Sequence, residues 1–187
     1  MSTKIAFSIK TDTDKMENQI VVIRPLTEND AAAFKALRLA SIADSPTAVW
    51  PTVEEESRLT PEQVKAKLEQ TPNQVVFGAF IGDQLAGIAG LRRESLIQLL
   101  HKASIWGVFV RPEMRKAGIA RQLFACIKAH AQALGVLQIH LSVNAENGRA
   151  RDLYASLGFQ RYGIEPRGAC IAGQFYDEEH MCLRLDA

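Results

Sequence analysis

The sequence has few cysteines, no long hydrophobic run and almost no net charge. Its 187 residues include three cysteines, which are far apart and lack C-x-x-C spacing. This excludes a disulfide-stapled scaffold and a cysteine-based structural zinc module, and we expect no metal site. No apolar run approaches the length of roughly 18 residues that a membrane-spanning helix needs. The formal net charge is +1, from 22 Lys and Arg against 21 Asp and Glu, which argues against a nucleic-acid or membrane-surface partner.

The length of 187 residues fits one domain of ordinary size. Because 47% of the residues are hydrophobic, the chain can form a hydrophobic core. The N-terminus lacks the continuous apolar region of a signal peptide, so we expect a soluble, cytoplasmic protein. Residues 1–18 are mostly polar, although Ile5, Phe7 and Ile9 alternate with period two. This segment is therefore expected to be a flexible leader or an extra edge strand, and the domain is expected to cover 19–187.

The first half of the chain alternates between strand-like and helix-like patterns. The expected elements are a strand at 20–23, a helix between Asp30 and Ser45, a polar helix from Pro61 to about Gln70, and two strands at 75–81 and 85–91 joined by a hairpin turn. The acidic run Glu54–Glu56 between the two helices is interpreted as a solvated loop or helix face.

The second half predicts a strand, a long helix and a second strand in succession. The expected elements are a strand at 104–110, a helix from about Gly118 to Leu134, a strand at 137–143, a short helix containing 150–157, and two further strands around a loop at 165–173. Such a strand–helix–strand unit favours a parallel crossover within an otherwise antiparallel sheet. The predicted fold class is one α/β (α+β) domain: a mixed, mostly antiparallel sheet flanked by helices.

The segment between strand 104–110 and the long helix has the composition of an anion site. The first N–H groups of a helix lack partners within the helix and, together with the helix dipole, attract negative charge. Gly118 and Ala120 leave room for a diphosphate, and Arg115, Lys116 and Arg121 add positive charge. The same residues also fit a helix start that merely packs against the sheet. The P-loop pattern G-x-x-x-x-G-K-[ST] and the Rossmann pattern G-x-G-x-x-G are absent.

A second motif lies downstream and points to a family. Asn147, Ala150 and Tyr154 have helical spacing, and Gly158-Phe159 closes the segment. Arg115-x-x-Gly118-x-Ala120 resembles the R/Q-x-x-G-x-G/A motif of the GCN5-related N-acetyltransferase (GNAT) superfamily, and the later string resembles that family's second conserved stretch. The expected order of elements also resembles the GNAT fold over roughly residues 20–185.

The resemblance implies roles for particular residues. It implies that the parallel strand pair splays apart and that the gap receives the pantetheine arm of acetyl-CoA. It implies that Tyr154 is the general acid for the leaving thiolate. The implied cofactor contacts are the backbone of Val108, Phe109 and Val110, the pyrophosphate loop Arg115, Lys116, Ala117, Gly118, Ile119, Ala120 and Arg121, and the side chain of Asn147.

The general base is not identified by sequence. Many family members carry a Glu on one of the splayed strands, whereas here Ser142 occupies the corresponding position. His101, Glu94 and Glu178 are ionisable residues of regions that border the acceptor side, but each fits a surface residue better. Deprotonation through ordered water, or capture of an amine that is already neutral, remains open. The acceptor pocket is expected to involve 45–60, with Trp50, and 165–178.

The predicted function is direct, acetyl-CoA-dependent acetyl transfer to a primary amine. The acceptor is expected to be a small-molecule amine or a protein amino group, and a homodimer through the C-terminal strands is consistent with the resemblance. The alternative is a non-catalytic acyl-CoA-binding regulatory module, which the absence of a Glu base favours. A nucleotide or nucleic-acid binder is disfavoured by the balanced charge.

Overall fold

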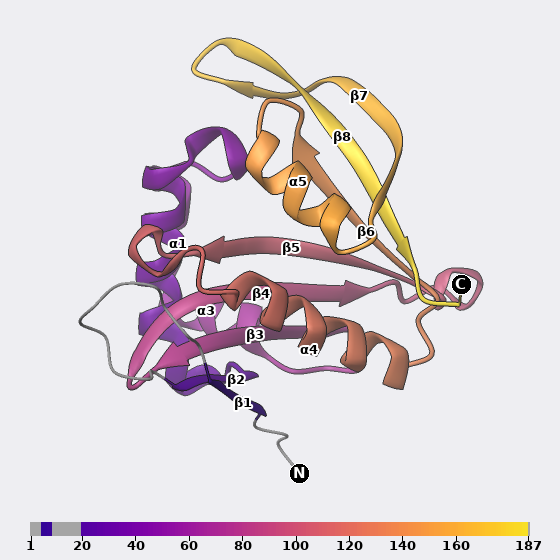
Figure 1. The fold of residues 1–187 in the computed structure, drawn as a ribbon. Coiled ribbons are helices and arrows are strands. Elements are labelled where there is room, and N and C mark those ends of the chain that lie inside the picture. The colour runs from indigo at the N-terminus through magenta and orange to yellow at the C-terminus, as the bar shows by residue number, and fades with distance from the viewer. Residues whose placement is uncertain (1–4, 9–19, 187) are drawn as a thin grey trace.

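One eight-stranded sheet connects the N-terminal and C-terminal parts of the chain (Figure 1). The computed structural model describes residues 5–8 and 20–186. The strand order is β1-β2-β3-β4-β5-β6-β8-β7. The strands are β1 Ile5–Ser8, β2 Ile20–Pro25, β3 Gln74–Ile81, β4 Gln84–Arg93, β5 Lys102–Val110, β6 Gln138–Asn144, β7 Gln160–Ile171 and β8 Gln174–Arg184. The helices are α1 Ala31–Asp44, α2 Val53–Arg58, α3 Pro61–Leu68, α4 Ile119–Ala133 and α5 Gly148–Ser156.

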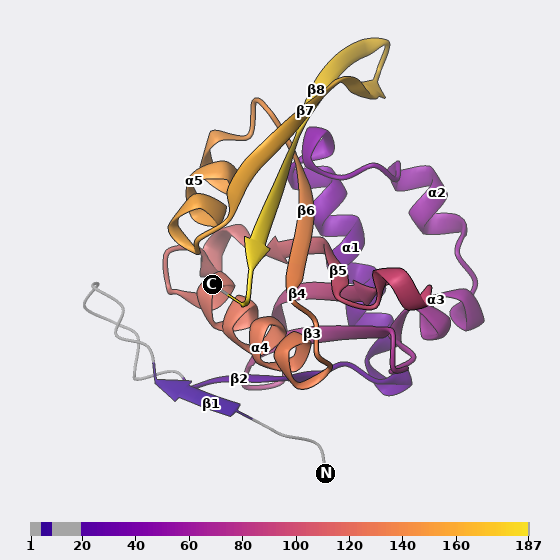
Figure 2. The ribbon, with the colours of Figure 1, turned by 90° about the vertical axis from the view of Figure 1, so that its right-hand side faces the viewer.

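Helices cover both faces of the sheet, which explains why its central strands are apolar throughout. Figure 2 shows α4 and α5 on one side and α1, α2 and α3 on the other. On β3, Val75 and Phe77 belong to the core beneath α4, while Val76 and Phe80 belong to the core beneath α1 and α3. A strand buried on both faces reads as a continuous hydrophobic run. The short helices α1 and α3 gain their stability from this packing.

The parallel pair β5–β6 is joined at one end and open at the other. Its partners are Lys102 with Gln138, Ala103 with Ile139 and Ser104 with His140. Beyond these pairs β5 continues to residue 110 and β6 to residue 144 without pairing to each other. The helix between them is α4, so the crossover and the splayed pair are confirmed.

A bulge in β5 lies beside this opening. Ile88 pairs with Phe109 and Gly90 with Trp106, so one residue of β4 faces two of β5. The extra residue is accommodated at Gly107, whose φ of +64° lies in the left-handed region that glycine adopts without strain. The bulge turns the backbone of the second half of β5 relative to its neighbour.

The structure differs from the sequence-based prediction in two places. The predicted loop at 165–173 is wrong, because β7 runs to Ile171 and the turn comprises only Ala172 and Gly173. The interpretation of Glu54–Glu56 as solvated is wrong for Glu56, which is buried on the additional helix α2.

At the N-terminus, β1 pairs antiparallel with β2 at the edge of the sheet, while Ile9 lies outside the described residues. The division into 1–18 and 19–187 stays a prediction. Within the described part of the chain, every helix is too short or too polar to cross a bilayer.

Candidate active site

A cavity of about 1470 Å³ opens along the gap between β5 and β6. Its walls come from β4, β5, β6 and β8, the loop before α4, the start of α5 and the segment 45–51. Of the residues assigned to the site from the sequence, the cavity brings together Val108, Phe109, Val110, Arg115, Lys116, Gly118, Ile119, Ala120, Arg121, Asn147 and Tyr154. The side chain of Ala117 instead packs against the core, so its backbone amide stays a predicted contact.

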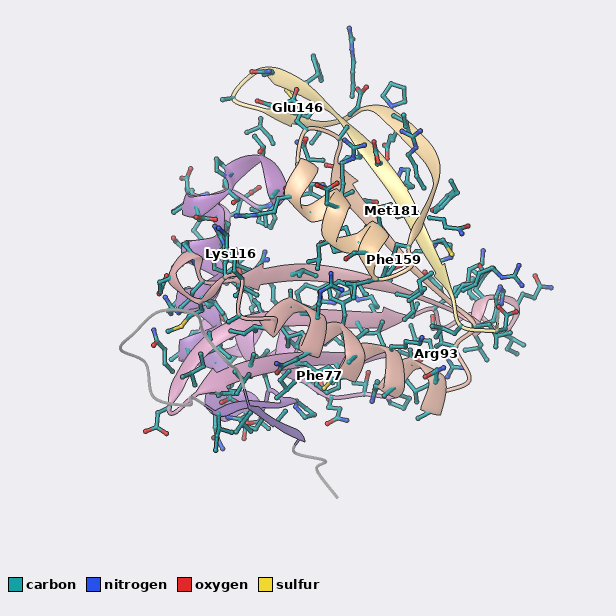
Figure 3. The ribbon with its side chains drawn as sticks, viewed as in Figure 1. Phe77, Arg93, Lys116, Glu146, Phe159 and Met181 are labelled. Atoms are coloured by element: carbon teal, nitrogen blue, oxygen red, sulfur yellow. The ribbon has the colours of Figure 1, made fainter. Side chains whose placement is uncertain are left out.

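The N-terminus of α4 is open and uncapped. Gly118 is the N-cap at φ +75°, and no side chain caps the helix. A Cβ atom added at Gly118 would meet no protein atom within 4 Å. Lys116, which is labelled in Figure 3, lies on the preceding loop, and its φ of +66° is a left-handed conformation that is costly for a non-glycine residue. The free amides and the open space fit a diphosphate, and Lys116 adds a positive charge.

Arg115 connects three segments around this loop. Its Nε donates to the backbone oxygen of Val110 at 3.0 Å, its Nη2 pairs with the Asp44 carboxylate, and its guanidinium lies 5.5 Å from the centre of the Phe109 ring. The hydrogen bond from Arg115 lowers the pKa of Asp44 below its usual value. Sequence analysis counted Arg115 among the positive charges of the anion site, and the structure shows this charge balanced by the Asp44 carboxylate at the end of α1.

Tyr154 lies on the inner face of α5 and borders the cavity. Its ring packs 5.6 Å from Phe124 and 6.0 Å from Phe159, centre to centre, and the residue is 9% exposed. Burial raises the pKa of Tyr154 to about 12, because removal from water disfavours the phenolate. The side chain therefore stays a neutral proton donor throughout the physiological range.

Asn147 caps the N-terminus of α5, the helix that carries Tyr154. Its Oδ1 accepts from the backbone N–H of Ala150 at 3.2 Å, a typical N-cap contact. Since Oδ1 is used in this way, the group of Asn147 that fits a ligand is its Nδ2 donor. Nearby, Nη2 of Arg121 donates to Oγ of Ser156 at 2.8 Å and ties α4 to α5.

Glu178 on β8 is a cavity residue that the sequence placed at the surface. It is 4% exposed, so the surface interpretation is wrong. Burial raises the pKa of Glu178, while a hydrogen bond from Trp50 and the proximity of His180 act in the opposite direction. Of the other two ionisable candidates, Glu94 is exposed and lines the cavity, and His101 does not line it.

A buried ionic cluster forms another part of the wall. Arg38 on α1 faces Glu56 on α2 with Nη2–Oε2 at 3.4 Å, and Nζ of Lys67 on α3 lies 3.4 Å from the other carboxylate oxygen. Arg38 and Lys67 line the cavity. Sequence analysis missed this cluster. One signal was available: Arg38 follows Phe34 by four residues and therefore lies on the same buried face of α1.

Three polar side chains form a chain on the opposite wall. Ser142 Oγ lies 2.9 Å from Nδ1 of His180, and Nε2 of His180 lies 3.1 Å from Oε2 of Glu165. Sequence analysis noted Ser142 but not its two partners, because strand register rather than sequence spacing brings them together. Across residues 5–8 and 20–186, no three His, Cys, Asp or Glu side chains are grouped so that they could hold a metal ion.

Comparisons with known proteins agree with this architecture. Residues 39–159 match the Acetyltransferase (GNAT) family. The chain is 28% identical over 141 residues to a mycothiol acetyltransferase from Thermobispora bispora, covering 73% of this chain and 45% of that protein. The chain thus spans about half the length of this curated relative.

Two solved structures have the same fold. An acetyltransferase of the GNAT family from Streptococcus pneumoniae superposes with a TM-score of 0.80 at 25% identity, covering 88% of this chain and 99% of that one. A putative acetyltransferase from Salmonella typhimurium, solved with its cofactor acetyl-CoA, superposes with a TM-score of 0.75 at 22% identity, covering 89% and 95%. The family match covers well over half of the sequence, and this chain belongs to the acetyltransferase (GNAT) family.

Proposed function

We propose that this chain is an acetyl-CoA-dependent N-acetyltransferase that transfers the acetyl group directly to a primary amine. The observation that carries the proposal is one cavity containing the gap between β5 and β6, the uncapped start of α4 and the ring of Tyr154. Membership of the family supports the same activity. The proposed acceptor is a small-molecule amine or an amino group of a protein.

The residues present fit the cofactor. The amides of 116–121 and the charge of Lys116 suit its diphosphate, and the open space at Gly118 lets the diphosphate reach the backbone. The backbone of 108–110 faces a gap without a strand partner, so its polar groups suit the amides of the pantetheine arm. The Nδ2 group of Asn147 suits a carbonyl of the same arm. When bound, acetyl-CoA supplies an activated thioester carbonyl.

Two groups of the chain serve the chemistry in this proposal. A backbone amide of 108–110, next to the bulge, polarises the carbonyl by donating a hydrogen bond to its oxygen. Tyr154 donates its proton to the leaving thiolate, because its phenol stays protonated at physiological pH. Direct transfer needs no nucleophile on the protein.

We further propose a homodimer in the cytoplasm, where acetyl-CoA is available. Support for the dimer comes from the edge strand β7 and its hairpin partner β8, which extend beyond the rest of the sheet (Figure 2). They carry exposed large apolar side chains at Tyr162, Ile164 and Phe175. An exposed edge with apolar side chains favours pairing with a second copy.

Calorimetry and a thiol-release assay test the activity. Titration of the protein with CoA and with acetyl-CoA should show binding below millimolar concentration, and a panel of primary amines should give amine-dependent release of free thiol. Binding without turnover across the panel would favour the acyl-CoA-binding regulatory module. The absence of binding to either ligand would reject the proposal.

A further inference from the structure

Ser142, His180 and Glu165 link the cavity wall to solvent through consecutive hydrogen bonds. They come from β6, β8 and β7, and the two contacts measure 2.9 Å and 3.1 Å. Ser142, which is exposed, and the half-buried His180 line the cavity, whereas Glu165 lies outside its lining and has a side chain that is 57% exposed. The chain of contacts thus has an inner end and an outer end.

The sheet register sets the position of the inner end. Ser142 is the direct cross-strand partner of His180. It lies two residues beyond His140, the last residue of β6 that pairs with β5. Because the pairing with β5 ends at His140, Ser142 lies on the diverging stretch of β6. Alternate residues of a strand share a face, so Ser142 lies on the same face of β6 as His140, and both border the cavity.

The two contacts select one form of the imidazole. An ionised Glu165 carboxylate can only accept, so Nε2 of His180 must carry the hydrogen in that contact. Nδ1 of the neutral ring is then an acceptor, and the Ser142 hydroxyl donates to it. With its hydrogen directed at His180, Ser142 Oγ has lone pairs left to accept a hydrogen bond from a molecule in the cavity.

We propose that Ser142, His180 and Glu165 form a proton relay that deprotonates the acceptor ammonium; this rests on the proposed function. The ammonium N–H gives its proton to Ser142 Oγ while the Ser142 hydroxyl proton moves to Nδ1 of His180. The products are a neutral amine and an imidazolium, which the Glu165 carboxylate stabilises. The imidazolium then releases its Nε2 proton to water at the exposed end, and exchange of the remaining Nδ1 proton through water returns the ring to its Nε2–H form. The proton released by acetylation of an ammonium leaves by this route.

Other ionisable groups face His180, and they support this assignment. On β7 the Tyr162 ring lies 6.0 Å from the imidazole, on β6 His140 contacts that same tyrosine, and Glu178 is two residues away on β8. Glu178 is buried, and its hydrogen-bond partner Trp50 has an indole N–H that only donates, so Trp50 cannot take a proton from Glu178. Its carboxylate suits attraction of the ammonium into the cavity, whereas the relay has an exit to solvent.

The test compares two acceptors that differ in protonation. A primary alkylamine such as butylamine is protonated at pH 7, whereas methoxyamine is neutral there. His180→Gln should lower kcat/KM for butylamine by roughly 100-fold, the usual contribution of a general base, and leave methoxyamine nearly unchanged. Glu165→Gln, at an exposed position, should give a smaller loss with the same dependence on the acceptor. The loss for butylamine should shrink as the pH rises and the free amine accumulates.

Matched variants separate the relay from structural damage. His101→Gln makes the same substitution outside the cavity and should behave as the parent protein. Equal losses for the two amines, or no loss in His180→Gln, would overturn the relay. If Glu178→Gln, and not His180→Gln, lost activity with butylamine but kept it with methoxyamine, Glu178 would be the general base instead. A parent protein that releases no thiol with either amine would instead reject the proposed function, and the relay with it.

A measurement without acceptor checks the hydrogen bonds themselves. ¹⁵N NMR of the histidine side chains, with His180 assigned through His180→Gln, should show the Nε2–H tautomer at neutral pH. Ser142→Ala should shift the Nδ1 resonance of His180, because the ring loses its donor. An Nδ1–H tautomer would contradict the relay even if the protein is an active acetyltransferase.

Discussion

Nη2 of Arg38 lies 3.4 Å from Oε2 of Glu56, and the two side chains are 6% and 1% exposed. A buried charge that loses its partner is strongly destabilising, by about 3–5 kcal/mol. The contact joins α1 to α2 and so holds the segment that contributes Trp50 to the cavity. The pair is therefore a structural support of the acceptor wall.

A double-mutant cycle measures this support. We expect Glu56→Gln, which leaves Arg38 without its buried partner, to lower the free energy of unfolding by about 3 kcal/mol. Arg38→Met should lower it by less, because Lys67 still pairs with Glu56. The double variant should lose clearly less than the sum. Urea unfolding monitored by circular dichroism gives the values. The exposed pair Arg58 and Glu54 on α2 is the control, and the corresponding substitutions there should change little. Strict additivity in the buried cycle would refute the coupling.

Tyr154→Phe should separate catalysis from cofactor binding. The substitution keeps the ring packed against Phe124 and Phe159 but removes the proton donor, so kcat should fall roughly 10- to 100-fold while the Kd for CoA stays close to the parent value. Single-turnover kinetics with calorimetry measure the two quantities. Tyr176→Phe on β8, outside the cavity, is the control. An unchanged rate where chemistry limits turnover would remove Tyr154 from the mechanism.

The raised pKa of Tyr154 also predicts how stability depends on pH. The folded state holds the phenolic proton to a pKa of about 12, whereas the unfolded chain releases it near 10. The stabilisation is complete below pH 10 and is lost as the pH rises from there towards 12, by about 2–3 kcal/mol in all. Unfolding of the parent and of Tyr154→Phe between pH 9 and 12 should show this difference, and parallel curves would contradict it.

Gly118→Ala tests the diphosphate position against a control on the same helix. Gly118 and Gly135 flank α4 at φ +75° and +73°, and an added Cβ meets no protein atom at either position. Both alanine variants should lose about 1 kcal/mol of stability from the left-handed backbone. Only Gly118→Ala should also weaken CoA binding, because its methyl group enters the space proposed for the diphosphate. Equal CoA affinity in the two variants would show that the diphosphate does not bind next to Gly118.

Asp44→Asn should strengthen CoA binding. The Asp44 carboxylate neutralises Arg115 beside the proposed diphosphate position, so its removal leaves a net positive charge there. We expect an affinity gain of about twofold to fivefold at low ionic strength that diminishes with added salt, as screening predicts. Asp186→Asn removes the same charge from a pair with Arg184 outside the cavity and should have no effect. Weaker binding in Asp44→Asn would show that Asp44 matters for orienting Arg115.

Local patterns made most of the fold predictable. Hydrophobic periodicity, together with capping and turn residues, located the elements from β2 to α5 except α2, because most of them bury a face of regular spacing. The loop predicted at 165–173 failed because β7 is exposed along most of its length and includes polar and glycine residues such as Glu165 and Gly168, which also suit a loop. Pairing with the hairpin partner β8 stabilises β7. The sequence of one strand alone does not reveal which strand it pairs with.

The side of the cavity proposed for the cofactor was more predictable than the side proposed for the acceptor. Its residues form two continuous motifs, whose backbone conformation matters as much as their side chains. The acceptor wall is assembled from separate strands and helices, so Ser142 and His180 meet only through sheet register. Glu56 looked like one of three equivalent acidic residues, and only the packing of α2 against α1 distinguishes it.

The three-residue pairing between β5 and β6 has a consequence for which side chains around the opening can be exchanged. Two strands that share a short parallel contact and then diverge leave an opening that is a property of the backbone, and it survives exchange of the side chains around it. A sheet of this kind can therefore exchange Trp50 or Glu178, the residues proposed to face the acceptor, without rebuilding the opening proposed for the thioester.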